Sequence, residues 1–263
     1  MTDSSSEHAP GLSALGARLS DISSRHEGLV VGLTGSVASG KTTLANKVSA
    51  ILADAHKVET VSTDGFLYPN EILEERGLTL RKGFPETYNV EALGDAIAAL
   101  SNGAADFPGY SHVTYDIDPD MTRSIAQPDI LILEGLGFQP LSPPPRPARE
   151  PDYLVYLDAT EDDLLTWYTE RFHRLWRAAE ADPTSFYANF LHMSEPELLD
   201  FAKSVWDRIN LPNLRDHIAP LKETADIVVL KDADHAIRIA RLFSHLRPET
   251  WRREFLPART QYL

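Results

Sequence analysis

The sequence predicts an α/β fold in which a mostly parallel sheet of five strands carries helices on both faces. Five short runs rich in Val, Ile and Leu alternate with stretches of helical periodicity. The runs lack the apolar–polar alternation of a strand with one wet face, so we expect each strand to be buried on both sides. Strands and helices that alternate along a chain are typical of a parallel sheet covered by helices.

The predicted elements follow one another in chain order. The strands are the runs Leu29–Leu33, Val58–Ser62, Asp129–Leu133, Tyr153–Leu157 and Asp226–Leu230. The helices are the periodic segments Lys41–Leu52, Val90–Leu100, Asp162–Ala179, Glu195–Ile209 and Ala233–Leu246. Ser194, with Glu197 three positions later, predicts a capping box at the start of the fourth helix. Five prolines in Leu141–Pro151 predict a stiff surface connection there.

We expect one domain over residues 29–250. A short, partly disordered N-terminal segment (1–28) would precede this domain, and a C-terminal tail (251–263) would follow it. The proline-rich connection is not a domain boundary in this interpretation, because apolar strands of the same kind flank it on both sides.

Composition and charge exclude several classes of protein. The 263 residues include 25 Lys and Arg against 39 Asp and Glu, which gives a net charge of −14. This acidic balance argues against a nucleic-acid binder and against docking on anionic lipid. Cysteine is absent, so no disulfide scaffold or thiolate site is expected. No run approaches the ~18 apolar residues of a membrane span, and Met1–Pro10 lacks the features of a secretory signal; we expect a cytoplasmic protein.

A phosphate-binding motif follows the first predicted strand. Residues 35–42 match the pattern G-x-x-x-x-G-K-[ST] and lie between a strand and a helix. In such a loop the backbone N–H groups hold phosphate oxygens, the lysine reaches the terminal phosphates and the hydroxyl group ligates Mg²⁺. The sequence therefore predicts ATP and Mg²⁺ as ligands. The expected nucleotide-binding residues are Gly35, Ser36, Val37, Ala38, Ser39, Gly40, Lys41, Thr42 and Thr43.

Two carboxylates follow other predicted strands. Asp64 comes just after the second strand, and Glu134 follows the third. Because the carboxyl ends of parallel strands meet at one edge of a sheet, both side chains should lie beside the phosphate loop. Asp64 could accept a proton from an attacking hydroxyl group, and Glu134 could act with Thr42 at a Mg²⁺ site. The loop alone does not say where the phosphate goes. Transfer to water would indicate an NTPase, transfer to a small hydroxyl compound a kinase, and a protein partner a nucleotide-dependent switch.

Several segments together resemble one family. These segments are Gly32–Thr42, Ser62–Asn70, Lys82–Tyr88, Tyr110–Asp116, Pro128–Leu136 and Thr166–Phe172. In this order they resemble bacterial type I pantothenate kinases, which are P-loop kinases of the phosphoribulokinase/uridine kinase superfamily. The likeness runs from about Leu29 to Leu246. It implies a P-loop kinase fold and ATP-dependent phosphorylation of the hydroxyl group of pantothenate, the first step of coenzyme A biosynthesis.

The resemblance also implies roles for individual residues. Asp64 matches the catalytic base, Lys41 matches the phosphate-loop lysine and Arg171 matches an arginine near the transferred phosphate. The residues that match the acceptor site are Tyr110, His112, Tyr115, Tyr168, Phe172 and Asn210. The first three of these cluster after Gly109, where we expect a loop that faces one pocket. Members of the family tend to dimerise, so a homodimer is one expectation for this chain.

Two alternatives remain open at the level of the sequence. One is a related kinase that phosphorylates another small hydroxyl compound, such as a nucleoside, a sugar or a hydroxy acid. The other is a nucleotide-binding regulator without transfer activity. The chain departs from the family pattern at Asn46, Gly137 and Leu175, and the last two of these positions are expected near the acceptor pocket.

Overall fold

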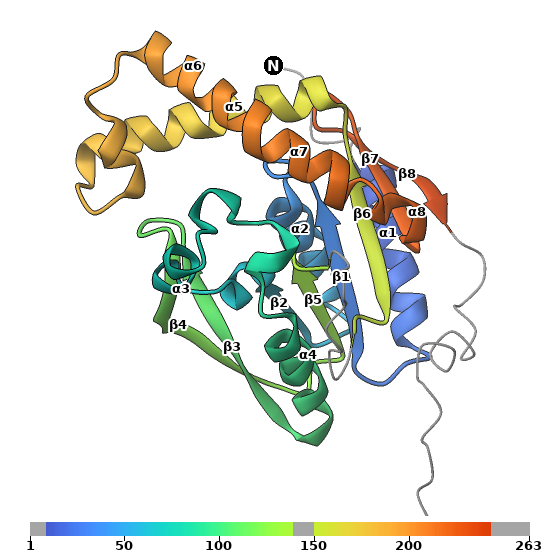
Figure 1. The fold of residues 1–263 in the computed structure, drawn as a ribbon. Coiled ribbons are helices and arrows are strands. Elements are labelled where there is room, and N and C mark those ends of the chain that lie inside the picture. Colours follow the sequence, from blue (N-terminus) through green and yellow to red (C-terminus); the bar gives the residue numbers. More distant parts are fainter. Residues whose placement is uncertain (1–8, 139–149, 243–263) are drawn as a thin grey trace, which may run out of the picture.

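The computed structural model describes residues 9–138 and 150–242, which Figure 1 shows as coloured ribbons. The expectations for the chain before residue 9, for most of Leu141–Pro151 and for the tail beyond residue 250 fall outside the described residues. The domain limits therefore stay a prediction.

The main sheet has six strands in the spatial order β2–β5–β1–β6–β7–β8. Its strands are β1 (Leu29–Gly35), β2 (Val58–Ser62), β5 (Ile130–Glu134), β6 (Tyr153–Asp158), β7 (Ile227–Lys231) and β8 (Ile237–Leu242). The first five pair in parallel, so all five predicted strands and the α/β fold class are confirmed. The order of the strands in the sheet changes direction at β1, which lies between β5 and β6. Ligands of such folds bind at the carboxyl ends of the strands beside this switch point, so we expect a ligand there.

The sixth strand corrects the prediction of a helix over Ala233–Leu246. Within the described part of that segment the chain forms β8, which pairs antiparallel with β7 and closes the edge of the sheet. Ile237 and Ile239 pack against the core, whereas Arg238 between them and Ala240 after them are exposed. This period of two is the signature of a strand with one wet face, and it outweighs the helical pattern that the longer window suggested.

Four of the predicted helices are present, and three of them begin and end within one residue of their predicted limits. They are α2 (Lys41–Leu52), α4 (Val90–Ala99), α5 (Glu161–Ala178) and α6 (Glu195–Val205), with the short helices α3 (Asn70–Glu75), α7 (Leu211–Asn213) and α8 (Leu221–Thr224). The capping box is confirmed, since the Ser194 N–H donates to the Glu197 carboxylate at 2.8 Å. Beyond α6 the chain continues through two π-helical turns, Trp206–Asn210 and Leu214–Ile218, where the prediction had a regular helix up to Ile209.

The helix α1 (Ala9–Ser23) was not among the predicted elements. Its residues Leu15, Leu19 and Ile22 are buried in the same cluster as the apolar side chains of α2 and of β1. Figure 1 shows α1 and α2 on one face of the sheet, with α4 on the other. The N-terminal segment therefore contributes part of the main core.

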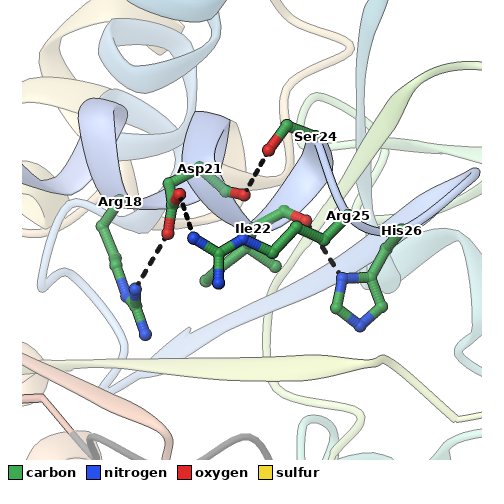
Figure 2. A network of polar contacts seen from close by, with 6 residues as sticks. All are labelled: Arg18, Asp21, Ile22, Ser24, Arg25 and His26. Atoms are coloured by element: carbon green, nitrogen blue, oxygen red, sulfur yellow. Dashed lines mark hydrogen bonds and ion pairs between the residues drawn. The ribbon is translucent and has the colours of Figure 1, made fainter.

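Polar contacts hold the end of α1 (Figure 2). The Asp21 carboxylate accepts from Arg18 at 3.1 Å and from Arg25 at 2.7 Å, and the Ser24 hydroxyl group donates to the Asp21 carbonyl oxygen. A ring nitrogen of His26 lies 3.0 Å from the carbonyl oxygen at position 22, which also accepts from the backbone N–H of Arg25. These contacts fix the turn that leads into β1.

A second, two-stranded sheet was also missed. β3 (Ala104–Ser111) and β4 (Asp116–Ala126) form a long antiparallel hairpin beside α4. Most of β4 is exposed, and prolines interrupt both strands, so neither has the apolar run that the prediction relied on. In Figure 1 the hairpin and an arm made of α5 and α6 project from the same side of the molecule.

Among the described residues, no helix combines the length and the apolar character that crossing a membrane would require.

Candidate active site

The phosphate loop joins the buried end of β1 to the first turn of α2. Ala38 (φ 61°) and Gly40 (φ 94°) adopt left-handed backbone conformations, which are rare for alanine and easy for glycine. A strained residue such as Ala38 is typical of a loop that holds a ligand. The hydroxyl groups of Ser36 and Ser39 are buried, yet neither has a hydrogen-bond partner among the described residues. Since buried polar groups are normally paired, these hydroxyl groups fit a phosphate as their acceptor.

Lys41 begins α2, and its Nζ folds back over the loop. It donates to the carbonyl oxygens of the loop's first two residues at 3.2 and 2.8 Å. Burial lowers the pKa of Lys41, and the carboxylates of Glu134 and Asp64 oppose that fall. Arg171 lowers this pKa further, so its guanidinium lies within electrostatic range of the loop. Two cations and two carboxylates therefore converge on the phosphate loop.

Glu134, the last residue of β5, is only 6% exposed. The strand register places it beside Leu33 of β1 and Ser62 of β2, and the Thr42 hydroxyl group donates to its Oε1 at 3.0 Å. Burial raises the pKa of Glu134, while Lys41 lowers it. A hydroxyl group and a carboxylate beside a phosphate loop are ligands of the kind that Mg²⁺ takes from a protein, with substrate phosphates and waters filling its other positions.

Within the described ranges, no group of three or more His, Asp or Glu side chains could hold a metal ion. A magnesium ion that shares its ligands between the protein and a nucleotide does not need such a group.

A tight turn, Thr63–Phe66, presents Asp64 beside the end of β5. The Asp64 N–H donates to the Ser62 hydroxyl group at 3.3 Å, which caps the turn. Gly135 has a φ of 148°, and a Cβ atom there would lie 1.9 Å from the hydroxyl oxygen of the first turn residue. Glycine at this position lets the turn pack directly against the end of β5. Asp64 consequently lies near enough to raise the pKa of Glu134.

Tyr88 contacts Asp64 directly, and the sequence prediction missed this residue. Its hydroxyl group donates to Oδ1 of Asp64 at 3.1 Å, and its ring is 3% exposed. Burial raises the pKa of Tyr88 well above its ordinary value and Asp64 raises it further, so the phenol keeps its proton. The only signal for Tyr88 was its place in the motif segment Lys82–Tyr88. A Cβ atom at Gly137 would lie 3.1 Å from the Tyr88 ring, so a residue without a side chain leaves room for that ring.

The tip of the hairpin carries the three polar aromatic residues predicted for the acceptor site. Tyr110 lies on β3 and not in a loop, whereas His112 and Tyr115 lie in the turn between the strands. The ring centroid of Tyr110 is 5.2 Å from that of His112 and 6.0 Å from that of Tyr115. Burial lowers the pKa of His112, Asp64 opposes this, and two cations lower it further. Burial and the two cations therefore favour the neutral imidazole, which lies within electrostatic range of Asp64.

Lys82 is a second residue that the sequence prediction did not single out. Its Nζ donates to Oδ1 of Asn70 and to the carbonyl oxygen of Tyr115, each at 2.6 Å. The same nitrogen lies 5.0 Å from the centroid of each tyrosine ring of the hairpin tip. Burial lowers the pKa of Lys82 to about 8, whereas Asp116 and Asp64 raise it. Lys82 thus ties the hairpin tip to α3 and places a cation beside the aromatic residues predicted for the acceptor site.

Arg171 lies half-buried on α5, and its positive charge lowers the pKa values of Lys41 and His112. Arg174 and Arg177 on the same helix are exposed. Arg177 pairs with a glutamate of α6 at 3.0 Å. Of the three arginines, Arg171 is the one whose charge reaches both the phosphate loop and the hairpin tip.

Tyr168 precedes Arg171 by about one helical turn. Burial raises the pKa of Tyr168 to about 12, and a side-chain hydrogen bond from Asn210 acts in the opposite direction. Asn210 ends the first π-helical turn, and such turns are frequent at functional sites. The ring of Tyr168 also packs against that of Trp206, at 5.6 Å between centroids. The structure therefore brings Tyr168 and Asn210 together, and their role in an acceptor site stays a prediction.

Phe172 occupies a different setting from the other predicted site residues. It is 7% exposed and lies in the aromatic core of the arm. Its ring neighbours there are Tyr168, Tyr187, Phe190 and Phe201. Its contact with Tyr168 links it to another residue predicted for the acceptor site, and its role as an aromatic wall stays a prediction. Leu175, one of the departures from the family pattern, packs against the same core.

The arm and the hairpin touch each other beside this cluster. Phe186, in the segment of the arm that joins α5 to α6, stacks on Tyr115, with 4.6 Å between ring centroids and 18° between planes. The Phe186 N–H also donates to the carbonyl oxygen of Val113 at 2.7 Å. These two contacts join segments that are about 70 residues apart in the sequence.

Comparison with known proteins identifies the family. The sequence profile of the Phosphoribulokinase / Uridine kinase family matches residues 30–176. A pantothenate kinase of Klebsiella pneumoniae (strain 342) is 40% identical over 225 residues, which cover 81% of this chain and 71% of that protein. The chain belongs to the pantothenate kinase family. Another member, from Parvibaculum lavamentivorans, is 41% identical over 221 residues, which cover 80% of this chain and 68% of the relative.

Solved structures support the same fold for this pantothenate kinase family member. A kinase attributed to a fructose transport system in Silicibacter sp. TM1040 superposes with a TM-score of 0.61 at 25% identity, over 81% of this chain and 94% of the other. D-glycerate 3-kinase from Cryptococcus neoformans superposes with a TM-score of 0.56 at 14% identity, over 88% and 97% of the two chains. The P-loop kinase fold expected from the resemblance is therefore confirmed.

Proposed function

We propose that this member of the pantothenate kinase family transfers the terminal phosphate of ATP to the hydroxyl group of pantothenate, and so forms 4′-phosphopantothenate. This reaction would be the first step of coenzyme A biosynthesis. The observation that carries the proposal is the place of Asp64. It sits between the phosphate loop and the polar aromatic hairpin tip, and it acts on the pKa values of Lys41, Glu134, Tyr88 and His112.

The proposed reaction is one displacement at phosphorus. The acceptor oxygen bonds to the terminal phosphorus while the bond from that phosphorus to the bridging oxygen breaks, and ADP leaves. The hydroxyl proton passes to the carboxylate of Asp64, which Tyr88 holds in place. Lys41 and Arg171 stabilise the negative charge that spreads over the transferred group. Thr42 and Glu134 would hold Mg²⁺, which supplies charge neutralisation at the phosphates.

The acceptor side has the chemistry that pantothenate requires. Pantothenate carries a carboxylate, an amide and two hydroxyl groups, so its recognition needs several donors and a few acceptors. The protonated phenols of Tyr110, Tyr115 and Tyr168 supply donors, and the neutral imidazole of His112 and the amide of Asn210 supply both kinds of group.

The test is a coupled ADP-release assay with the purified protein and Mg·ATP. Pantothenate is compared with a panel of nucleosides, sugars and other hydroxy acids at equal concentration. We expect the highest kcat/KM with pantothenate. A higher value with another acceptor would reassign the substrate, and ATP turnover that no acceptor stimulates would favour a nucleotide-dependent regulator.

Two further expectations belong to this proposal. They are a cytoplasmic location and a homodimer, and neither is needed for the chemistry above. Both stay predictions, which cell fractionation and light scattering can check.

A further inference from the structure

Lys231, the last residue of β7, reaches the phosphate loop from outside the motif. Its Nζ donates to the carbonyl oxygen of Ser39 at 2.7 Å. The same nitrogen lies 3.8 Å from the ring centroid of Trp167, which α5 places beside it. A Cβ atom at Gly40 would lie 3.0 Å from this nitrogen, so the ammonium group packs closely on the loop. The loop and an aromatic ring therefore fix the ammonium group on two sides.

The contact with Ser39 constrains one peptide unit of the loop. The Ser39 carbonyl and the Gly40 N–H belong to the same planar, trans peptide, so they point in opposite directions. With the carbonyl oxygen held outward by Lys231, the N–H is turned to the other side of the loop. Lys41 holds the carbonyl groups at the loop's other end in a similar way. Two lysines from different elements thus tie down carbonyl groups of the loop and leave its N–H groups for an anion.

The charge of Lys231 is not neutralised by a carboxylate. Within the part of the chain that the structure describes, no Asp or Glu forms an ion pair with it. Burial lowers the pKa of Lys231 to about 8, Lys47 of α2 lowers it further, and Asp163 of α5 raises it. Burying half of a cation without a partner carboxylate costs desolvation free energy. The negative charge of a bound polyphosphate would offset that cost.

We propose that Lys231 is a positioning residue of the nucleotide site, which aims the Gly40 N–H into the phosphate cradle and adds positive charge beside the bound triphosphate. This inference rests on the proposed role of the loop in binding a nucleotide and is independent of the acceptor. It adds a contact from the end of β7, two strands away from β1, to a motif that is otherwise contained within residues 35–42.

The test measures equilibrium binding of Mg·ADP and Mg·ATP without any acceptor. Lys231→Met removes the charge and the hydrogen bond but keeps an apolar stem against Trp167. The matched control is Lys57→Met, since Lys57 also donates to a backbone carbonyl group but lies before β2, at the opposite edge of the sheet. We expect Lys231→Met to weaken nucleotide binding about 10- to 100-fold, as the loss of a charged hydrogen bond implies. Lys57→Met should bind like the wild type.

Further readouts separate positioning from a structural role. Lys231→Arg should recover most of the affinity, because arginine keeps the charge and the donor. In the transfer assay, the KM for ATP should rise in Lys231→Met while the KM for the acceptor stays unchanged. If Lys231→Met does not fold, Lys231→Gln is judged by the same criteria.

Three results would overturn the inference. The first is wild-type nucleotide affinity in a folded Lys231→Met or Lys231→Gln protein. The second is an equal rise in the KM values of both substrates. The third is a wild-type protein that binds no nucleotide at all, which would overturn the proposed function together with this inference.

Discussion

The hydrogen bond from Tyr88 to Asp64 offers a test at the scale of one residue. Tyr88→Phe removes the hydroxyl group that holds Oδ1 of the proposed base at 3.1 Å. A hydrogen bond to a charged group contributes about 1.5–3 kcal/mol, so we expect kcat to fall about tenfold or more. The KM for ATP should stay unchanged, because the Tyr88 hydroxyl group bonds to Asp64 and, among the described residues, to no residue of the loop. Tyr68→Phe is the control, and equal kcat values in the two variants would contradict the role of Tyr88.

The pKa of Lys82 predicts an effect of pH. Because burial lowers this pKa to about 8, Lys82 loses its charge as the pH rises from 7 to 9. The acceptor side then loses the cation that ties the hairpin tip to Asn70, so kcat/KM for the acceptor should fall along an alkaline limb near pH 8. Lys82→Arg keeps its charge at that pH and should move the limb upward. If the alkaline limb of Lys82→Arg stays at the pH of the wild type, the limb reports the ionisation of another group.

Residues at strand ends were predictable from the sequence, whereas Tyr88 and Lys82 were not. Glu134 follows an apolar strand directly, so its position at the sheet edge follows from the parallel arrangement alone. Tyr88 and Lys82 lie on irregular segments, and only the folding of these segments over the turn at Asp64 makes them neighbours. No periodic pattern in the sequence encodes such a contact.

The contact between the arm and the hairpin makes a prediction at the scale of elements. Phe186→Ala removes the ring that stacks on Tyr115, so the hairpin tip loses its support from the arm. We expect the KM for the acceptor to rise several-fold, while nucleotide affinity is unchanged because the loop lies on other elements. Leu191→Ala, at an exposed position of the same arm, is the control and should leave both values unchanged. An acceptor KM at the wild-type value in Phe186→Ala would show that this contact does not support the site.

Elements with a strong apolar pattern were predicted well, and those without one were missed. The five parallel strands are buried on both faces, so their sequences carry the signal directly. β8 lies at the edge of the sheet and has one face exposed to solvent, so its six residues carry only a short pattern of period two. The longer window Ala233–Leu246 also fits a helical pattern, and the prediction of a helix there was therefore wrong. The hairpin of β3 and β4 buries few residues of its second strand, so its sequence offers almost no apolar run.

At the scale of the whole molecule, α1 and α2 share one core with β1, directly behind the phosphate loop. Leu19 of α1 is 2% exposed in that core. Leu19→Ala should lower the free energy of unfolding by about 2–5 kcal/mol, as other large-to-small core changes do. Nucleotide binding in the folded variant should persist, because α1 contributes no group to the loop. Denaturant titration measures the effect, and a loss below 1 kcal/mol would mean that α1 is not part of the core.

The central claim concerns Asp64, and transfer of labelled phosphate from ATP to pantothenate tests it most directly. Asp64→Asn keeps the size of the side chain and an oxygen that can accept from Tyr88, but it cannot take up the proton of the acceptor hydroxyl group. The account predicts that this variant transfers phosphate about 10²- to 10⁴-fold more slowly while it binds Mg·ATP with wild-type affinity. Wild-type transfer by Asp64→Asn would contradict the account.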